Sequence, residues 1–463
     1  MGSNKYINWI FLAVSLLAAF VVIEIYDWKF YEFISLAMTF QFLLLLLSKM
    51  GTTIPIKEFT AFIYCVQLLI GPIWTYRFYP NIKIGFMIVN EDVYFPFTLT
   101  YMLAFFLGLF FPRFSNSKVN LAQLVNKSIN KKESEVIGII LIIIAFVAQT
   151  ASSLFPSPGL SFIYVLLGSL RFVGLYYLWM AKYKYRYLFL LAVFLPMSVL
   201  SLGGGLFIEL FIWGFLTFAV FQLRHPLSFR TNLLMFLGGV LFVFLLQTVK
   251  VDFRKVTWKG EGKDYSMVDR LAVLGSLITS VNFSDKQARE KANIRFIVRI
   301  NQGYINAYIL RNMPARRDFA NGEYFKDELI GIFVPRFLFP DKAVVGDHAK
   351  FENFAGWKLN SKVAMSVSIL GDGYGNFGYW GGMIFCLFYG VLTNYLLHLL
   401  VSLARKHEIS LILWMPYVFA FTMRCGDEFY IITNHIFKSS ILILIIMVIL
   451  KKSGYFTKKI NAS

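Results

Sequence analysis

Long apolar runs recur along the chain, and one polar stretch of roughly 120 residues, from about 250 to 375, interrupts them. The runs are about 17–22 residues long, which is the length that an α-helix needs to cross the hydrocarbon core of a bilayer. Because they are continuously apolar rather than alternating, they predict helices and not the strands of a membrane barrel. We expect about twelve spans, centred near residues 6–25, 33–48, 60–75, 93–112, 136–154, 161–181, 188–203, 206–222, 232–249, 380–402, 409–423 and 431–450.

The polar stretch divides the chain into three predicted parts. Residues 1–249 form an N-terminal membrane bundle of about nine spans, residues 250–375 a loop subdomain, and residues 376–463 about three further spans with a basic tail. The composition agrees, since 58% of the residues are hydrophobic and 15% are charged, which is more apolar than ordinary globular usage. Lipid tolerates no polar region of this size, so the loop subdomain is expected to lie on one side of the membrane.

The formal net charge of +19 suggests nucleic acid as a partner, but the positions of the basic residues argue against it. Lys and Arg cluster in alternate short connections: Lys49 and Lys57; Arg113, Lys118, Lys127, Lys131 and Lys132; Lys182, Lys184 and Arg186; Arg224 and Arg230; Arg405 and Lys406; Lys451, Lys452, Lys458 and Lys459. This positive-inside pattern predicts that both termini face the cytoplasm, and that the loop subdomain lies outside. Its own basic residues do not contradict this, because long loops translocate largely regardless of charge.

Metal and redox chemistry find no support in the loop subdomain. None of the three cysteines, Cys65, Cys386 and Cys425, falls within it, which excludes a disulfide framework or a thiolate metal site there. The subdomain also has no Asp-x-Asp pattern to hold a divalent ion. We therefore expect neither a metal nor a cofactor.

The loop subdomain is predicted to be helical. Ser266 and Asp269 resemble a capping box with Asp in place of Glu, and apolar residues follow at helical spacing. A second helix is predicted to begin at Ser284, with Gln287 three residues on, and to run until Pro314.

One face of this second helix carries cationic and amide side chains. Arg295, Arg299, Gln302 and Asn306 recur at i, i+4, i+7 and i+11, which places two guanidinium groups and two amides on one stripe. The spacing leaves two interpretations open, a solvated outer face or a ridge that binds an anion.

An irregular, arginine-containing segment follows the second helix. Arg316 and Arg317 precede a short helical piece near residues 323–333 and then the sequence Pro-Arg-Phe-Leu-Phe-Pro-Asp-Lys at 335–342. Two prolines five residues apart predict a rigid, extended backbone that presents Arg336 between aromatic residues. The alternative is that these aromatic residues only lay the loop on the membrane surface.

A glycine-rich run, Gly-Asp-Gly-Tyr-Gly-Asn-Phe-Gly-Tyr-Trp-Gly, leads the chain back into the membrane at residues 371–381 and contains Asp372, Tyr374 and Asn376. So many glycines permit a close backbone approach or a sharp turn. The run is not a phosphate loop, because no Gly-Lys-Ser/Thr follows.

The segments at 335–342 and 371–381 resemble those of the Wzy-type bacterial polysaccharide polymerases, which include O-antigen polymerases. Many members carry a Pro-Arg…Pro-x-Lys element, then an acidic residue in a Gly-Glu/Asp-x-Tyr-x-Asn-Phe-Gly run that enters a late helix. The layout of many spans with one large late loop extends the resemblance across the chain. The resemblance implies a GT-C-like glycosyltransferase fold in the bacterial inner membrane, with the loop subdomain in the periplasm.

The activity that this resemblance implies is glycosyl transfer. Oligosaccharide repeat units linked to undecaprenyl pyrophosphate would be polymerised on the periplasmic face, by an inverting displacement that needs no metal. The partners would be the lipid-linked oligosaccharide, membrane lipid and a candidate co-polymerase that regulates chain length, and no nucleic acid.

The residues suit a reaction whose leaving group is a lipid pyrophosphate, because arginine neutralises such a charge without a metal. The candidates for binding it are Arg295, Arg299, Arg336 and Arg424, with Arg316, Arg317, Tyr374 and Asn376 beside them. The attacking sugar hydroxyl needs a base, and the candidates are Asp372 and His348. Plainer roles stay open for both, since Asp372 also suits helix capping or pairing with a nearby arginine, and a lone loop histidine suits the surface.

Arg424, Asp427 and Glu428 cluster at the external end of the span at 409–423. They form either an ion network that holds helix ends together or a second side of the pyrophosphate site.

Two rival functions involve similar substrates. A lipid-linked oligosaccharide flippase would be expected to show two related halves, and a large asymmetric loop is not its hallmark. An O-antigen ligase shares the broad layout but typically has a His-rich loop, whereas this loop subdomain contains only His348.

Overall fold

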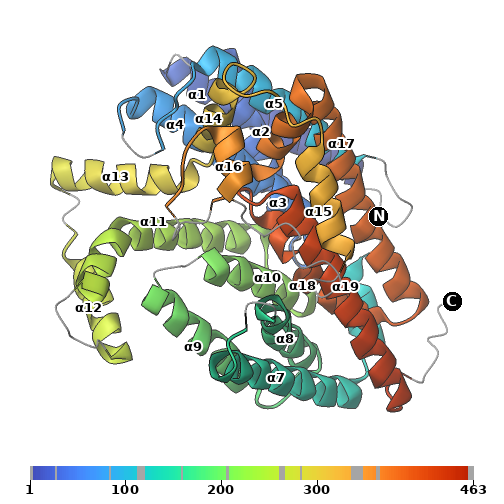
Figure 1. Ribbon diagram of the computed structural model, residues 1–463. Coiled ribbons are helices and arrows are strands. Elements are labelled where there is room, and N and C mark those ends of the chain that lie inside the picture. Colours follow the sequence, from blue (N-terminus) through green and yellow to red (C-terminus); the bar gives the residue numbers. More distant parts are fainter. Residues whose placement is uncertain are drawn as a thin grey trace.

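The computed structural model is built of helices, and no strand occurs in the part of the chain that it describes (Figure 1). It describes residues 4–26, 29–82, 85–111, 120–157, 160–204, 208–259, 266–281, 284–334, 348–360 and 365–456. The all-helical fold class expected from the apolar runs is therefore confirmed.

The helices of the first half of the chain run up to the polar stretch. They are α1 (Asn4–Tyr26), α2 (Phe30–Lys49), α3 (Ile56–Cys65), the π-helical turn η1 (Val66–Ile70), α4 (Gly71–Phe78), α5 (Glu91–Phe110), α6 (Leu121–Ser128), α7 (Lys131–Leu154), α8 (Ser161–Met180), α9 (Arg186–Gly204), α10 (Ile208–Arg224) and α11 (Phe229–Lys259).

The remaining helices form the polar stretch and the C-terminal part. They are α12 (Met267–Thr279), α13 (Lys286–Ile300), α14 (Gly303–Asn312), α15 (Glu323–Phe333), α16 (His348–Ala355), α17 (Ser368–Lys406), the 3-10 turns η3 (Ile409–Trp414) and η4 (Ala420–Met423) on either side of α18 (Met415–Phe419), and α19 (Phe429–Lys452).

Eight helical stretches are long and apolar enough to cross a membrane: Phe30–Lys49, Ile56–Phe78, Glu91–Phe110, Lys131–Leu154, Ser161–Met180, Phe229–Thr257, Ser368–Lys406 and Phe429–Lys452. Each overlaps one of the twelve predicted spans. The predicted spans at 6–25, 188–203 and 409–423 fall on shorter apolar stretches, Trp9–Val22, Arg186–Val199 and Ile409–Met423. The twelfth, at 206–222, corresponds to α10, which has 17 residues.

Close helix crossings hold the bundle together, and α5 with α17 is one of the most extensive. Gly108 on α5 and Gly390 on α17 lie at this crossing, where a Cβ atom on either residue would lie 2.2 Å from a backbone oxygen of the other helix. Small residues allow such close packing of helix backbones in membranes. The crossing fixes the position of α17, whose first turns contain the glycine-rich run with Asp372.

The glycine-rich run contains the sharp turn that the sequence permits. Gly378 interrupts α17 with a φ of 69°, a conformation that residues with a Cβ atom rarely adopt. The hydroxyl of Tyr101 donates to the carbonyls of Gly378 and Tyr379, at 2.9 and 2.6 Å, which satisfies groups freed by the kink. Residues 368–377 thus form a separate short helix at the N-terminal end of α17.

Helices of the polar stretch pack on the extended end of α11, which continues past the predicted boundary at 249 to Lys259. The predicted capping box is confirmed, because Ser266 and Asp269 bond reciprocally at the start of α12. Figure 1 shows α13 lying alongside α11, with α12 connecting their outer ends. This arrangement brings the predicted arginine stripe against α11.

Candidate functional site

The predicted single helix from Ser284 to Pro314 is wrong, because the chain breaks between α13 and α14. Asn301 is buried at the break, and its amide donates to Thr75 Oγ1 at 2.9 Å and to the carbonyl of Gly85 at 3.2 Å. These hydrogen bonds tie the non-helical chain at Asn301 to α4 and to the segment that follows it. They set the direction in which α13 runs.

A cavity of about 920 Å³ lies where α13 meets α11 and the turn before α19. Its polar lining combines three cations, one carboxylate and several neutral groups: Lys250, Arg295, Arg299, Asp427, Asn81, Gln247, Gln302, Tyr304 and Ser366. We call it the cationic cavity. Of the predicted stripe, three residues line it, whereas Asn306 is buried elsewhere and its side-chain oxygen accepts from Ser368 Oγ at 2.9 Å.

The two arginines of α13 differ in their partners. Arg295 forms a bidentate ion pair with Asp252 of α11, at 2.7 and 3.0 Å, and also donates to the backbone carbonyl of Thr248. The guanidinium of Arg299 has no hydrogen bond or ion pair with any residue that the structure describes. Arg295 is therefore an anchor between helices, and Arg299 is the cation available to a ligand.

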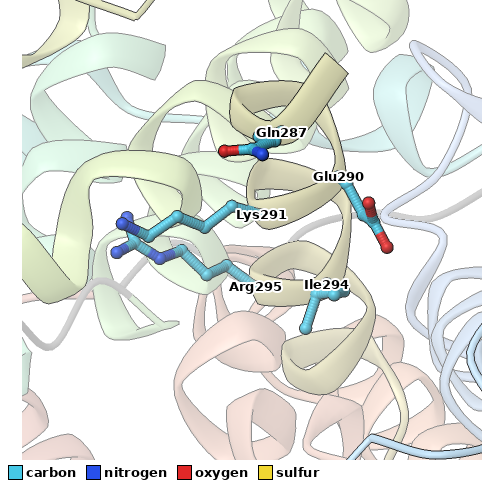
Figure 2. Close-up of a pocket in the computed structure, with 5 residues that line it drawn as sticks. All are labelled: Gln287, Glu290, Lys291, Ile294 and Arg295. Atoms are coloured by element: carbon cyan, nitrogen blue, oxygen red, sulfur yellow. The ribbon is translucent and has the colours of Figure 1, made fainter. Parts of the chain in front are cut away.

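A smaller depression of about 400 Å³ lies on the outer face of α13. Figure 2 shows Lys291 and Arg295 extending from the same side of the helix, while Glu290 points away from them. Because the charge of Arg295 is already compensated by Asp252, this depression offers a weaker anion site than the cationic cavity.

Asp427 supplies the carboxylate of the cationic cavity. It lies in a turn between η4 and α19, where its N–H donates to the carbonyl of Arg424 at 3.0 Å. Its Oδ2 atom is buried without a hydrogen bond among the described residues, and Arg424 Nη1 lies 3.7 Å away. Burial raises the pKa of Asp427 to about 7 against the opposing effect of Arg424, with Glu209 and Glu428 adding to the rise.

Arg424 itself is engaged by protein groups. Its guanidinium pairs with Glu209 of α10 and lies over the ring of Phe421, 3.7 Å from the centroid. The structure thus places Arg424 beside Asp427 but not in the lining of the cationic cavity.

A second charged cluster lies fully inside the protein, around Lys350 of α16. Its Nζ atom is 2.8 Å from Asp372 Oδ1 and 3.3 Å from Glu428 Oε2, and it also bonds to Glu328 of α15. All four side chains are at most 5% exposed. We call this set the Lys350 cluster; it joins α15, α16, α17 and the turn before α19.

Three carboxylates around one ammonium group leave an excess of negative charge in a buried place. Burial, with Asp372 next in importance, raises the pKa of Glu328 to about 9. Burial also raises the pKa of Glu428, against the effect of Lys350. For Lys350 burial acts in the opposite direction, but the carboxylates prevail and raise its pKa. Glu328 is therefore protonated at neutral pH.

Asp372, the first predicted base, belongs to this cluster and does not line the cationic cavity. Its Oδ1 atom accepts from the Asn376 amide at 2.8 Å, and its Oδ2 atom accepts from the N–H of Phe429 at 3.2 Å. Asp372 and Asn376, which are predicted as a base and as a substrate-binding residue, thus contact each other, and Asp372 pairs with Lys350 rather than with an arginine. A catalytic role for Asp372 stays a prediction.

The other predicted residues are scattered. The hydroxyl of Tyr374 donates to the carbonyl of Met313 at 3.0 Å, while Arg316 and Arg317 are exposed in the turn after α14. His348 begins α16. None of these four appears in the cavity lining that the described residues form. Arg336 lies outside the described residues.

The sequence pointed to some of the site residues and missed others. Lys250 is the first charged residue after the apolar run at 232–249, a position that marks the membrane boundary. Glu328 lies on the same inward face of α15 as Phe325 and Ile332. The helical spacing of these three residues in the sequence indicates that they share a face. Lys350 had no comparable signal. Among the described residues no group of three or more His, Cys, Asp or Glu side chains is arranged to hold a metal ion.

Comparison with known proteins adds one family. The sequence model of that family matches residues 115–458, which include α11, α13, the Lys350 cluster and Asp427. No curated protein and no solved structure matches the chain. The matched residues make up about three quarters of the 463. The chain belongs to the family described as Domain of unknown function (DUF8712).

Proposed function

We propose that this protein is a membrane glycosyltransferase that polymerises oligosaccharide repeat units linked to undecaprenyl pyrophosphate. The observation that carries the proposal is the cationic cavity, where Lys250 of the apolar helix α11 and Arg299 of the polar helix α13 line one wall each. A diphosphate between a lipid tail and a sugar would lie at this depth, at the boundary of hydrocarbon and water.

The sidedness of the cavity supports the proposal. Ser366 and Asp427, which line it, directly precede the membrane helices α17 and α19. The same helices end at the basic residues Lys406 and Lys452, more than 20 residues further on. If basic ends face the cytoplasm, the cavity opens on the opposite face. This is where lipid-linked repeat units are joined in the proposed reaction.

The charges suit the leaving group. As the bond between the sugar and the diphosphate breaks, negative charge develops on the diphosphate, and fixed cations stabilise it. Charge-assisted hydrogen bonds of this kind contribute about 1.5–3 kcal/mol each. Arg299 is placed to supply such bonds, because no described residue occupies its guanidinium.

The finer features of the proposal follow the resemblance to Wzy-type polymerases. They are about twelve spans in a GT-C-like arrangement, an inner-membrane location with both termini in the cytoplasm, and a periplasmic loop subdomain. The reaction would invert the anomeric configuration without a metal. A co-polymerase that sets chain length is the proposed protein partner.

The test uses the full chain purified into proteoliposomes with one lipid-linked repeat unit as substrate. We expect a ladder of lengthened glycans, strongly reduced by Arg299→Ala and unchanged by Arg289→Ala, which removes an exposed arginine of the same helix outside the cavity lining. A flippase would move the substrate across the bilayer without lengthening it, and a ligase would lengthen nothing until lipid A core was added. Either result would overturn the proposal.

A further inference from the structure

Resting on the proposed function, we propose that Asp427 is the base that takes the proton from the attacking sugar hydroxyl. This assigns the base to the turn before α19, instead of the predicted Asp372 or His348.

Access to the reacting groups singles out Asp427. Among the described residues that line the cationic cavity, it is the one carboxylate, and it shares that lining with Arg299. A base must come within hydrogen-bond reach of the hydroxyl whose proton it removes, and the hydroxyl must lie next to the sugar–diphosphate bond. Both conditions are met when the base and the diphosphate-binding cation face one cavity.

The neighbouring carboxylates are already committed. Both oxygens of Asp372 accept hydrogen bonds inside the Lys350 cluster, and Glu428 pairs with Lys350 at 3.3 Å. Glu209 pairs with Arg424. The Asp427 carboxylate, by contrast, has only a longer ion pair, 3.7 Å from its Oδ2 atom to Arg424 Nη1, and this oxygen has no hydrogen bond within the described chain.

The turn that carries Asp427 is held from two sides. On one side, Arg424 pairs with Glu209 of α10 and accepts the Asp427 N–H at its carbonyl. On the other, the next residue, Glu428, is fixed by Lys350. A catalytic group needs this kind of support, because its position must vary little between turnovers.

The surroundings of Asp427 keep both of its protonation states accessible near neutrality. Burial raises its pKa to about 7, which matches the pKa expected for a base working at that pH. Charged and titratable groups surround it from its own turn and from α10, α3 and α17, and others share the cavity lining from α11 and α13: Arg424, Cys425, Glu428, Glu209, Tyr64, Tyr389, Lys250, Arg295 and Arg299.

The proposed step balances as a single displacement. The acceptor hydroxyl oxygen forms the new bond to the anomeric carbon, and its proton moves to the Asp427 carboxylate. The bond between the anomeric carbon and the diphosphate oxygen breaks, and its electron pair leaves with the diphosphate beside Arg299. Asp427 then loses the proton to water, and no oxidant or metal is needed.

The deciding experiment compares Asp427→Asn, Asp427→Glu and Glu209→Gln in the proteoliposome assay. Asp427→Asn should lower the polymerisation rate by about 10²–10⁴-fold, the usual contribution of a positioned base. It should leave binding of undecaprenyl pyrophosphate, measured separately, within a few-fold of the natural protein. Asp427→Glu should recover part of the rate, and the natural protein should gain activity as pH rises through about 7.

Glu209→Gln separates a chemical role from a structural one. It removes the charge that Glu209 contributes to its ion pair with Arg424, and it leaves the Asp427 carboxylate in place. An equal loss of rate in Glu209→Gln and Asp427→Asn would show that Asp427 acts only through Arg424, and would overturn the inference. Full activity of Asp427→Asn would also overturn it while leaving the polymerase proposal intact. A natural protein that binds the lipid diphosphate but never lengthens the glycan would overturn both.

Discussion

The cationic cavity and the Lys350 cluster lie next to each other. Both contain cationic and carboxyl side chains, but these groups are paired with one another in the cluster and left open to a ligand in the cavity. In the Lys350 cluster, one ammonium group contacts three carboxylates, and all four side chains are excluded from water. In the cavity, Arg299 has no partner among the described residues and Asp427 has an unbonded oxygen. Asp427 and Glu428 are adjacent in sequence, but Asp427 lines the cavity and Glu428 belongs to the Lys350 cluster. The difference separates charges that organise the structure from charges that remain available to a ligand.

The largest expected effect is on the Lys350 cluster. Lys350→Met would leave the charged carboxylates of Asp372 and Glu428 buried without their cation, and breaking a buried ion pair from one side costs about 3–5 kcal/mol. We therefore expect a large fall in the apparent melting temperature of the purified protein. Lys326→Met, which removes an exposed lysine from α15, is the matched control. Equal melting temperatures for both variants would show that the cluster does not support the fold.

The cavity should respond in the opposite way. Arg299→Ala should weaken binding of undecaprenyl pyrophosphate by roughly 10- to 150-fold, equivalent to about 1.5–3 kcal/mol, with little change in stability. Arg295→Ala, one turn away, should mainly lower stability, because it leaves Asp252 without its bidentate partner. Titration and thermal melting of both variants measure the two effects. If Arg295→Ala weakens binding more than Arg299→Ala, the assignment of anchor and ligand-binding cation is reversed.

The sequence predicted the cavity better than it predicted the cluster. Arg295 and Arg299 were identified by their spacing, because helical periodicity is local and α13 preserves it. The break at Asn301 could not be foreseen, since it depends on contacts with Thr75 and Gly85, more than 200 residues away in sequence. Long apolar runs predicted the membrane helices for the same local reason.

The Lys350 cluster depends on contacts between four separate elements, and local patterns contain no record of such contacts. Asp372 is a predicted site residue, with pairing to a nearby arginine as one open interpretation, but the structure pairs it with Lys350. Asp427 was noted beside Arg424, yet the sequence did not show whether it faces a cavity. Burial and accessibility, which distinguish the two regions, arise only from tertiary packing.

A third experiment uses pH to test the state of the Lys350 cluster. The pKa of Glu328 is raised to about 9 in the folded protein from an ordinary value near 4.5. Between these values the unfolded chain releases a proton that the folded protein retains, so stability is lost as pH rises. Glu328→Gln mimics the protonated acid and removes this loss. Its melting temperature should exceed that of the natural protein by an amount that grows from pH 5 to pH 9.

Glu323→Gln, an exposed substitution at the start of the same helix, serves as the control and should show no such trend. A difference between Glu328→Gln and the natural protein that stays constant with pH would mean that Glu328 is ionised in the folded state. The Lys350 cluster would then have three charged carboxylates, and its contrast with the cavity would be smaller.

The smallest expected effect concerns Tyr374, which the resemblance places in substrate binding and the structure places in a hydrogen bond to the carbonyl of Met313. Tyr374→Phe should cost about 1 kcal/mol of stability, the net value of one buried hydrogen bond, and leave binding of undecaprenyl pyrophosphate unchanged. Tyr304→Phe alters a tyrosine that lines the cationic cavity and should show the reverse order of effects. Melting and titration of both proteins decide the matter. Weaker binding in Tyr374→Phe than in Tyr304→Phe would place Tyr374 at the substrate and extend the ligand-binding region into the packed interior.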